Sequence, residues 1–143
     1  MRFMILVKAT RESEAGATPG EALFAAMADF HEQLARAGVL LDAAGLQPSA
    51  RAWRVQYDGA QRRVIDGPFA ETKELVAGYT LIQTRSRDEA LEWTRRFPNP
   101  AVDGGIAEIE VRQLFELDDF AHSPGVQRFR ELGLGTAASA GRD

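Results

Sequence analysis

The spacing of hydrophobic and polar positions along the chain switches between two periods, and each stretch of constant period predicts one element. Residues 3–7 are short and apolar throughout, which predicts an interior strand covered on both faces. A polar stretch over residues 10–17 predicts a loop, and Thr18 and Pro19 then give a favourable N-cap and first helical residue. From there apolar residues recur at intervals of three and four, which predicts an amphipathic helix ended by Gly38.

Alternation with a period of two follows in the middle and at the end of the chain. Trp53, Val55 and Tyr57 alternate with polar residues, which predicts a strand whose apolar face, Trp53 included, belongs to the core. Asp58 and Gly59 form a hairpin-turn dipeptide, so residues 62–65 should fold back beside this strand. Further strands are predicted over residues 39–41, 75–84 and 106–115, and a second helix is predicted from its cap at Ser86 to the stop at Pro98.

These elements follow the order strand, helix, strand, hairpin, strand, helix, strand. The order predicts an α+β domain on the βαββαβ plan with an inserted hairpin, in which one antiparallel sheet carries two helices on one face. The other face stays bare, and the first strand, apolar on both sides, needs a cover there. We therefore predict a homodimer through this open sheet face. The polar row Glu108, Glu110 and Arg112 lies either between the two sheets or on a wet edge.

Composition narrows the class of protein without changing this fold. The 143 residues suit one domain over residues 1–116, followed by an extension over residues 117–143 with a short helix after Ser123 and a frayed end. No Cys is present and two distant His give no ligand spacing, so neither a metal nor a cofactor is expected. A net charge of −4 disfavours nucleic acid as a partner. Neither a membrane span nor a leader is predicted, and a cytoplasmic location is expected.

The stretch DGPFAETKE, which begins at Asp66, is the first candidate for a site because it combines a tight turn, an aromatic ring and four charges. Asp66 either accepts hydrogen bonds inside its own turn or acts as a general base that Phe69 shields from water. Glu71, Lys73 and Glu74 are either solvated surface charges or a cluster in which Lys73 holds an anionic substrate.

Three residues elsewhere in the chain are candidates for the same cavity. His31 lies on the flank of the first predicted helix. There, a half-buried ring bonded to a backbone carbonyl competes with an acid–base role that needs Asp42 or Asp66 within hydrogen-bond reach. Arg54 and Tyr79 sit on predicted strands, from which their side chains could line the cavity or belong to the core.

The stretch DGPFAETKE, together with the Gly-Tyr pair that begins at Gly78, resembles the signature of the YCII-related family in its DGPF-domain branch. The segments MRFMILV, FHEQLARAGVLL, GLQPS, DEALEW and IEVRQLFELDDF are similar to that branch too, so the resemblance covers residues 1 to about 120. It implies a dimeric α+β barrel of ferredoxin-like subunits. It implies no reaction, because the branch shares none that is established.

Two functions of different classes fit these observations. The first is binding of a small polar or anionic organic molecule in a cleft beside the turn, with Asp66 and His31 moving a proton if the protein is an enzyme. The ligand-binding residues would then be Arg54, Phe69, Glu71, Lys73, Glu74 and Tyr79. The alternative is a non-enzymatic ligand-sensing or partner-binding module associated with transcription regulation, as the resemblance implies.

Overall fold

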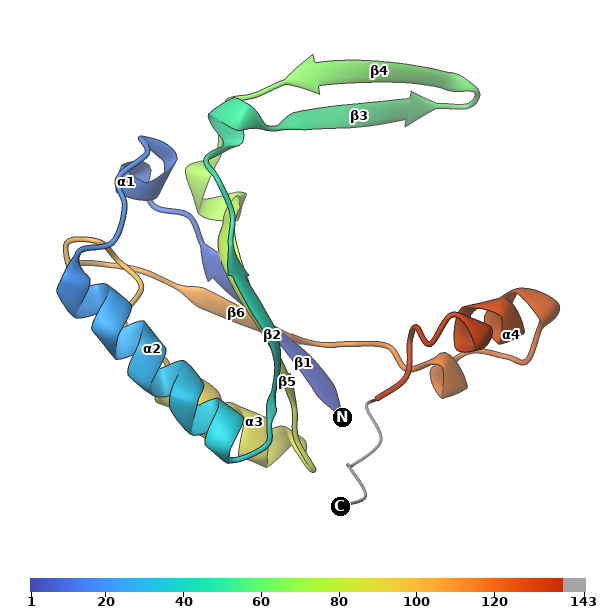
Figure 1. Cartoon of the computed structure of the whole chain (residues 1–143). Helices are drawn as coiled ribbons and strands as arrows, with labels where there is room; N and C mark the ends of the chain where they lie inside the picture. Colours follow the sequence, from blue (N-terminus) through green and yellow to red (C-terminus); the bar gives the residue numbers. More distant parts are fainter. Residues whose placement is uncertain (138–143) are drawn as a thin grey trace.

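The computed structural model describes residues 1–137, and its centre is a four-stranded antiparallel sheet in the order β2-β5-β1-β6 (Figure 1). The first strand of the chain is therefore an interior strand, as its uninterrupted apolar run predicted. The α+β architecture on the βαββαβ plan is confirmed. The sheet strands are β1 (Arg2–Lys8), β2 (Leu40–Gly45), β5 (Val76–Gln83) and β6 (Ile109–Gln113).

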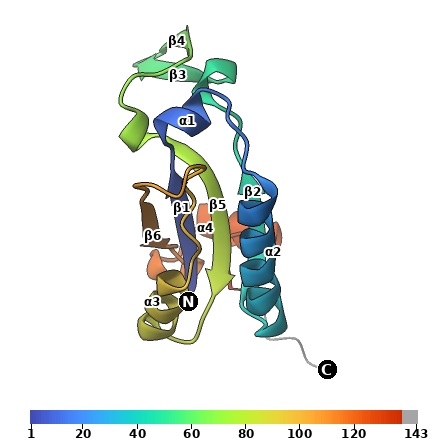
Figure 2. The ribbon, with the colours of Figure 1, turned by 90° about the vertical axis from the view of Figure 1, so that its left-hand side faces the viewer.

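Two helices, α2 (Glu21–Arg36) and α3 (Arg87–Arg95), lie on the same face of this sheet, as predicted (Figures 1 and 2). The predicted stripe of α2 supplies Phe30 and Leu34 to the core, and alternate residues of β1 meet them. Each such side chain that leaves water contributes about 1.5–3 kcal/mol. The buried core cluster consists of Phe3, Ile5, Phe30, Leu34, Val39, Ile82 and Ala90.

The opposite face of the sheet carries no helix, and strand register fixes which side chains it presents. Leu6 of β1 lies opposite Tyr79 of β5 and Glu110 of β6. Met4 lies opposite Leu81 and Arg112 in the same way. Residues paired across antiparallel strands share a face, so Glu110 and Arg112 lie on the open face and not on the helix-covered one. We call this surface the open sheet face, defined by Met4, Leu6, Tyr79, Leu81, Glu110 and Arg112.

Three predictions of local structure are wrong, and each error has a local cause. Residues 10–17 are not only loop, because α1 (Arg11–Glu14) forms there on a capping box between Thr10 and Ser13. Thr18 does not cap the next helix; Gly20 occupies that N-cap position without a side-chain hydrogen bond. The last strand is shorter than predicted, since β6 begins at Ile109 and the apolar Ile106 before it is exposed.

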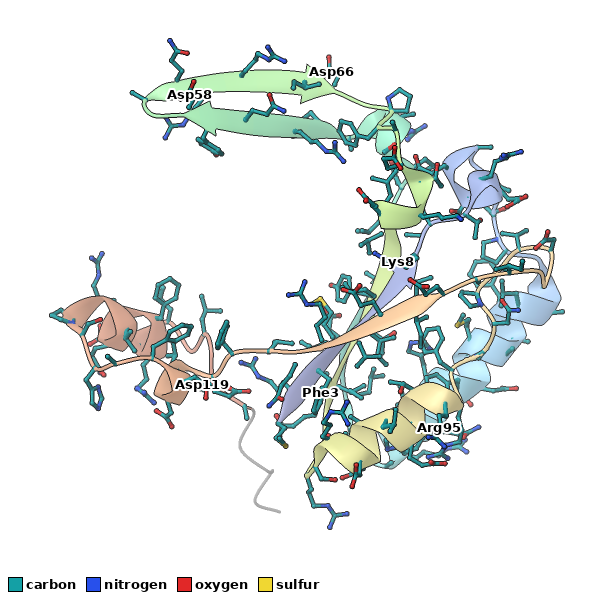
Figure 3. All side chains as sticks on the ribbon, turned by 180° about the vertical axis from the view of Figure 1, so that it is seen from behind. Phe3, Lys8, Asp58, Asp66, Arg95 and Asp119 are labelled. Atoms are coloured by element: carbon teal, nitrogen blue, oxygen red, sulfur yellow. The ribbon has the colours of Figure 1, made fainter. Side chains whose placement is uncertain are left out.

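The predicted hairpin forms, but it stands apart from the main sheet. Strands β3 (Trp53–Asp58) and β4 (Gln61–Asp66) pair only with each other. They project from the body of the molecule on the side opposite α2 and α3 (Figures 1 and 3). The prediction that Trp53 belongs to the core is wrong, because 66% of its surface is exposed. Alternation revealed an apolar face here but not what covers that face.

The remaining elements connect or extend this framework. Ser123 caps α4 as predicted, through a hydrogen bond from the Val126 amide. The frayed end predicted around Arg142 and Asp143 lies outside the described residues. Over residues 1–137, none of the helices is both long and apolar enough to cross a membrane. The short elements are η1 (Ser49–Arg51), η2 (Thr72–Glu74), η3 (Leu117–Asp119) and α4 (Pro124–Glu131).

Candidate functional site

The turn that begins at Asp66 is packed directly onto the segment before the hairpin. The Gly67 amide donates to the Ala52 carbonyl at 2.9 Å, and the peptide bond from Gly67 to Pro68 is cis. A Cβ atom on Gly67 would lie 1.8 Å from the backbone oxygen of Ser49, which is a collision. Only glycine therefore allows this approach. The Gly of the motif is required because the two ends of the hairpin meet here.

Ser49 connects this turn to the N-terminal part of the chain. Its hydroxyl accepts a hydrogen bond from the Phe69 amide at 3.1 Å and donates to Oε2 of Glu14. The Ser49 amide donates to Oε1 of the same carboxylate at 3.0 Å. Ser49 is only 7% exposed, so these bonds satisfy a buried polar group. Hydrogen bonds from Ser49 to Glu14 and from Phe69 to Ser49 thus connect α1, η1 and the turn.

An open hollow of about 430 Å³ lies beside these contacts. Much of its wall is apolar, and the turn contributes Phe69 to it. Two arginines, Arg51 and Arg54, also line it. Small-molecule sites are typically apolar concavities with a few placed polar groups, and the hollow has that character. Its apolar lining residues are Leu46, Pro48, Ala52, Phe69, Leu75 and Val76.

The two arginines of the hollow are held without acidic partners. The guanidinium of Arg54 stacks on the Phe69 ring, with 3.8 Å between its carbon and the ring centroid. Arg51 donates to the side-chain oxygen of Gln47 at 3.3 Å. Within residues 1–137 neither guanidinium forms an ion pair with Asp or Glu. Glu14 lines the hollow too, but Ser49 engages both of its carboxylate oxygens.

Asp66, the predicted general base, ends β4 opposite Trp53 and is exposed. It does not line the hollow, and its carboxylate makes no hydrogen bond or ion pair with any described residue. Glu71, Lys73 and Glu74 are exposed as well and lie outside the lining. Of the predicted ligand-binding residues, the structure therefore brings Arg54 and Phe69 together and leaves the charged end of the motif on the surface.

His31 lies in α2 on the helix-covered side of the sheet. Its Nδ1 is 2.7 Å from the Met27 carbonyl oxygen, and its Nε2 is 2.8 Å from the hydroxyl of Thr80. These partners match the structural role that competed with acid–base chemistry, and no carboxylate within the described chain bonds to the ring. His31 lies in α2 above the main sheet, whereas Asp66 ends β4 of the separate hairpin, and neither residue lines the hollow.

Tyr79 points to the open sheet face and not into the hollow. Its hydroxyl donates to Oδ2 of Asp42 at 2.8 Å, and Oδ1 of Asp42 accepts from the Ala43 amide at 2.9 Å. The bond to the Asp42 carboxylate raises the pKa of Tyr79 above its ordinary value, because the phenol must lose the donated proton to ionise.

Among the described residues, no group of three or more His, Cys, Asp or Glu side chains gathers to hold a metal ion.

Sequence reasoning missed Glu14 and Ser49 as residues that shape the site. They are 35 positions apart, and their contact follows no short motif. The pattern Thr10-x-x-Ser13 could have revealed α1, which carries Glu14, because a small hydroxyl residue at each of these positions can form a capping box.

Comparisons with known proteins place the chain in a family. The family model described as YCII-related domain matches residues 1–115. An "Uncharacterized protein R00369" of Rhizobium meliloti (strain 1021) is 38% identical over 80 residues, which are 56% of this chain and 64% of that protein. This chain thus matches less than two-thirds of that relative's length.

A solved structure with a related outline is 5-chloro-2-hydroxyhydroquinone dehydrochlorinase (TftG) from Burkholderia phenoliruptrix AC1100, in complex with 2,5-dihydroxybenzoquinone. It is 14% identical, with a TM-score of 0.44, and the match covers 81% of this chain and 95% of that one. A likeness of this size says nothing about the chemistry of the present chain.

Proposed function

This chain belongs to the YCII-related family, and from that premise we propose that it is a small homodimeric protein that binds a small organic anion in the hollow beside the turn at Asp66. The observation that carries the proposal is Arg54, a cation stacked on Phe69 at the wall of an apolar hollow and without an acidic partner in the described chain. A stacked guanidinium is pre-oriented for two parallel hydrogen bonds to a carboxylate.

The lining also indicates the class of ligand. Arg51 and Arg54 offer two positive charges, and the only carboxylate among the lining residues, Glu14, is occupied by Ser49. The apolar wall that includes Leu75 and Val76 favours a flat or aliphatic body over a highly polar one. A small carboxylic acid with an apolar body satisfies both requirements, and its anion would meet a wall whose two positive charges exceed the single negative charge of Glu14.

The proposal concerns binding, because a reaction would need a proton-transferring group at the wall. Glu14 is engaged, and Asp66 and His31 do not line the hollow. The acid–base roles of Asp66 and His31 stay predictions. Because Asp66 and His31 do not line the hollow, the geometry also favours the second candidate function, a ligand sensor without catalysis. Ligand binding by a sensor does not need a general base.

Thermal unfolding with benzoate tests the proposal, and uncharged benzamide serves as the matched ligand. At ten times its Kd, benzoate should stabilise the wild type by about 1.4 kcal/mol, which is about 3–6 °C for a domain of this size. Arg54→Gln should lose most of this shift, because it keeps a polar side chain and removes the charge. Arg63→Gln is the control, since it lies on the same hairpin outside the hollow.

Asp66→Asn adds a sharper comparison, because the geometry predicts that it keeps the benzoate shift. If benzoate protects Arg54→Gln as well as it protects Arg63→Gln, the hollow is not the anion site. If Asp66→Asn loses the shift while Arg54→Gln keeps it, the charged end of the turn, and not the hollow, binds the anion.

The homodimer in this proposal rests on the open sheet face. Its centre is formed by Met4, Leu6 and Leu81, which are half-buried in the single chain, yet no helix within residues 1–137 covers them. An apolar sheet face of this kind is stabilised when a second sheet packs against it. A second copy is the partner that we propose.

A further inference from the structure

We infer that two projecting segments of this chain clasp the second copy, so that the dimer is held by its arms as well as by its sheets. The hairpin arm is β3 and β4, and the C-terminal arm is the segment of residues 114–134 that contains η3 and α4. The inference rests on the homodimer of the proposed function and goes beyond it, because it gives a role to two regions that the ligand site and the open sheet face leave unused.

The placement of the arms is the first observation. Both leave the body on the side opposite α2 and α3, one at each end of the central sheet (Figures 1 and 3). In the view turned by 90°, α4 lies behind the sheet while the two helices lie in front of it (Figure 2). The arms therefore flank the open sheet face, and any body seated on that face meets both of them.

The hairpin arm presents apolar side chains that are largely exposed in the described chain, although the Arg62 guanidinium lies over the Tyr57 ring, 5.0 Å from its centroid. Register places Trp53, Val55 and Tyr57 of β3 on one face of the ribbon, together with Val64, which pairs with Val55. Trp53 is 66% exposed and Tyr57 68% exposed. An isolated two-stranded ribbon is marginally stable in water, and exposed aromatic side chains are the residues most enriched at interfaces between proteins. This arm needs a surface to pack on.

The C-terminal arm shows the same pattern on a different scaffold. It is fixed to the body by Arg2, whose guanidinium donates to both carboxylate oxygens of Glu116, at 2.9 and 3.1 Å. Within the arm, Arg130 donates to Asp118 at 2.9 Å, and the Leu117 amide donates to the carbonyl of Gly135, the residue just after the arm. The arm is thus internally bonded, yet it turns large apolar side chains outward. Phe115 and Leu132 are each 71% exposed, and Phe129 and Leu134 are exposed with them.

The open sheet face between the arms favours a second copy of this chain as the occupant. Asp42 lies at one edge of the sheet on β2, bonded to Tyr79, while Lys8, Glu110 and Arg112 lie toward the opposite edge. Glu108 continues the β6 row beside Lys8, so this second group has two basic and two acidic residues. A two-fold axis parallel to the strands would bring the β2 edge of each copy over the β6 edge of the other.

Such a pairing sets Asp42 of each copy over the edge that carries Lys8 and Arg112 in the other copy, with the apolar centres in contact between them. Every contact of a two-fold interface occurs in duplicate. Each arm would therefore add its apolar surface twice to the same dimer, and the face that the arms flank is complementary to itself. A partner of different sequence would form each of these contacts only once.

Trp53 provides a direct spectroscopic test, because the chain has only two tryptophans. The variant Trp93→Phe leaves Trp53 as the only tryptophan, so its fluorescence can be followed alone. In the clasped dimer its emission should shift to shorter wavelength and acrylamide should quench it several-fold less than in the dissociated protein. Dilution of the full chain through the dimer dissociation range, followed by sedimentation, provides both states. Emission and quenching that do not change while the dimer dissociates would overturn the clasp by the hairpin arm.

Dimer affinity tests both arms and separates this inference from the proposed function. Tyr57→Ser and Phe129→Ser should each raise the dimer Kd by about tenfold or more, the equivalent of about 1.4 kcal/mol. Gln56→Ser, on the other face of the hairpin, should leave it unchanged. Leu6→Asp should abolish the dimer through the open sheet face. Circular dichroism of each variant confirms that it folds.

The outcomes distinguish the two proposals. A dimer that Leu6→Asp breaks and that neither arm variant weakens overturns the clasp and leaves the sheet-to-sheet dimer standing. A wild type that stays monomeric at every concentration overturns both, while the benzoate experiment decides the ligand hollow independently of assembly. An arm variant that weakens the dimer, together with a protected Trp53, establishes the clasp.

Discussion

The helix-covered face of the sheet and the two arms carry the same kinds of residue in opposite surroundings. On the covered face, Phe3 and Ile5 are buried by side chains of the same chain. On the arms, Trp53 and Phe115 are mostly exposed in one copy. Large apolar side chains stabilise the fold only where they leave water, and the comparison shows that those of the covered face do so within the described chain while those of the arms do not.

The largest effect should come from the covered face. Leu34→Ala removes a side chain that is fully buried, and the cavity should cost about 2–5 kcal/mol of unfolding free energy. Trp53→Ala, measured in the same urea titration on the Leu6→Asp background, should change that free energy by about 0.5 kcal/mol or less, because an exposed side chain in a single copy buries little. Similar losses for the two variants would contradict the distinction between body and arms.

A second prediction concerns the joint between the body and the hairpin arm. Gly67→Ala should destabilise the protein by about 2–3 kcal/mol, because the new Cβ atom would lie 1.8 Å from the backbone of Ser49. Gly20→Ala is the control, since a Cβ there meets nothing within 4 Å, and it should cost about 1 kcal/mol or less as an N-cap substitution. Hydrogen exchange should report faster exchange in the β3 and β4 amides of the first variant alone.

The smallest effect concerns the hydrogen bond from Tyr79 to Asp42 on the open sheet face. This bond raises the pKa of Tyr79, so its stabilisation is present below the ordinary tyrosine pKa and is lost as the pH rises through the folded value. Tyr57→Phe leaves Tyr79 as the only tyrosine, and its ionisation can be followed by ultraviolet absorbance. Adding Asp42→Asn should move the titration to lower pH. An unchanged titration would show that the bond does not hold in solution.

The main features of the fold could be predicted from periodicity because each element of the body has one partner surface. The stripe of α2 and the apolar run of β1 both identify the face between helix and sheet, where Phe30, Leu34, Phe3 and Ile5 are buried. The other face of β1 has no cover in the described chain, and the predicted cover there stays a prediction. The hairpin shows the limit of this reasoning. Alternation around Trp53 correctly predicts a strand with an apolar face, but period alone does not say whether that face meets the same chain.

The turn at Asp66 could be predicted from the sequence, but the contacts that shape the hollow beside it could not. Asp66 and the charged residues after it marked a turn, and the turn exists. The contacts that pack this turn come from Gly67 and Phe69 of the turn itself, and from Glu14 and Ser49, which lie far away in the sequence. Side chains that act through contacts between distant segments leave no local spacing to detect.

The position of β1 in the sheet sets the order in which the chain can be completed during synthesis. β1 precedes the other described strands in the chain, and its two neighbours in the sheet are β5, which begins at Val76, and β6, which begins at Ile109. At about 5–20 residues per second, roughly 4–15 s pass before the first neighbour is translated. β1 is thus translated before either of its sheet neighbours, and α2, which is translated before both of them, is the first large element of the body that can pack on it.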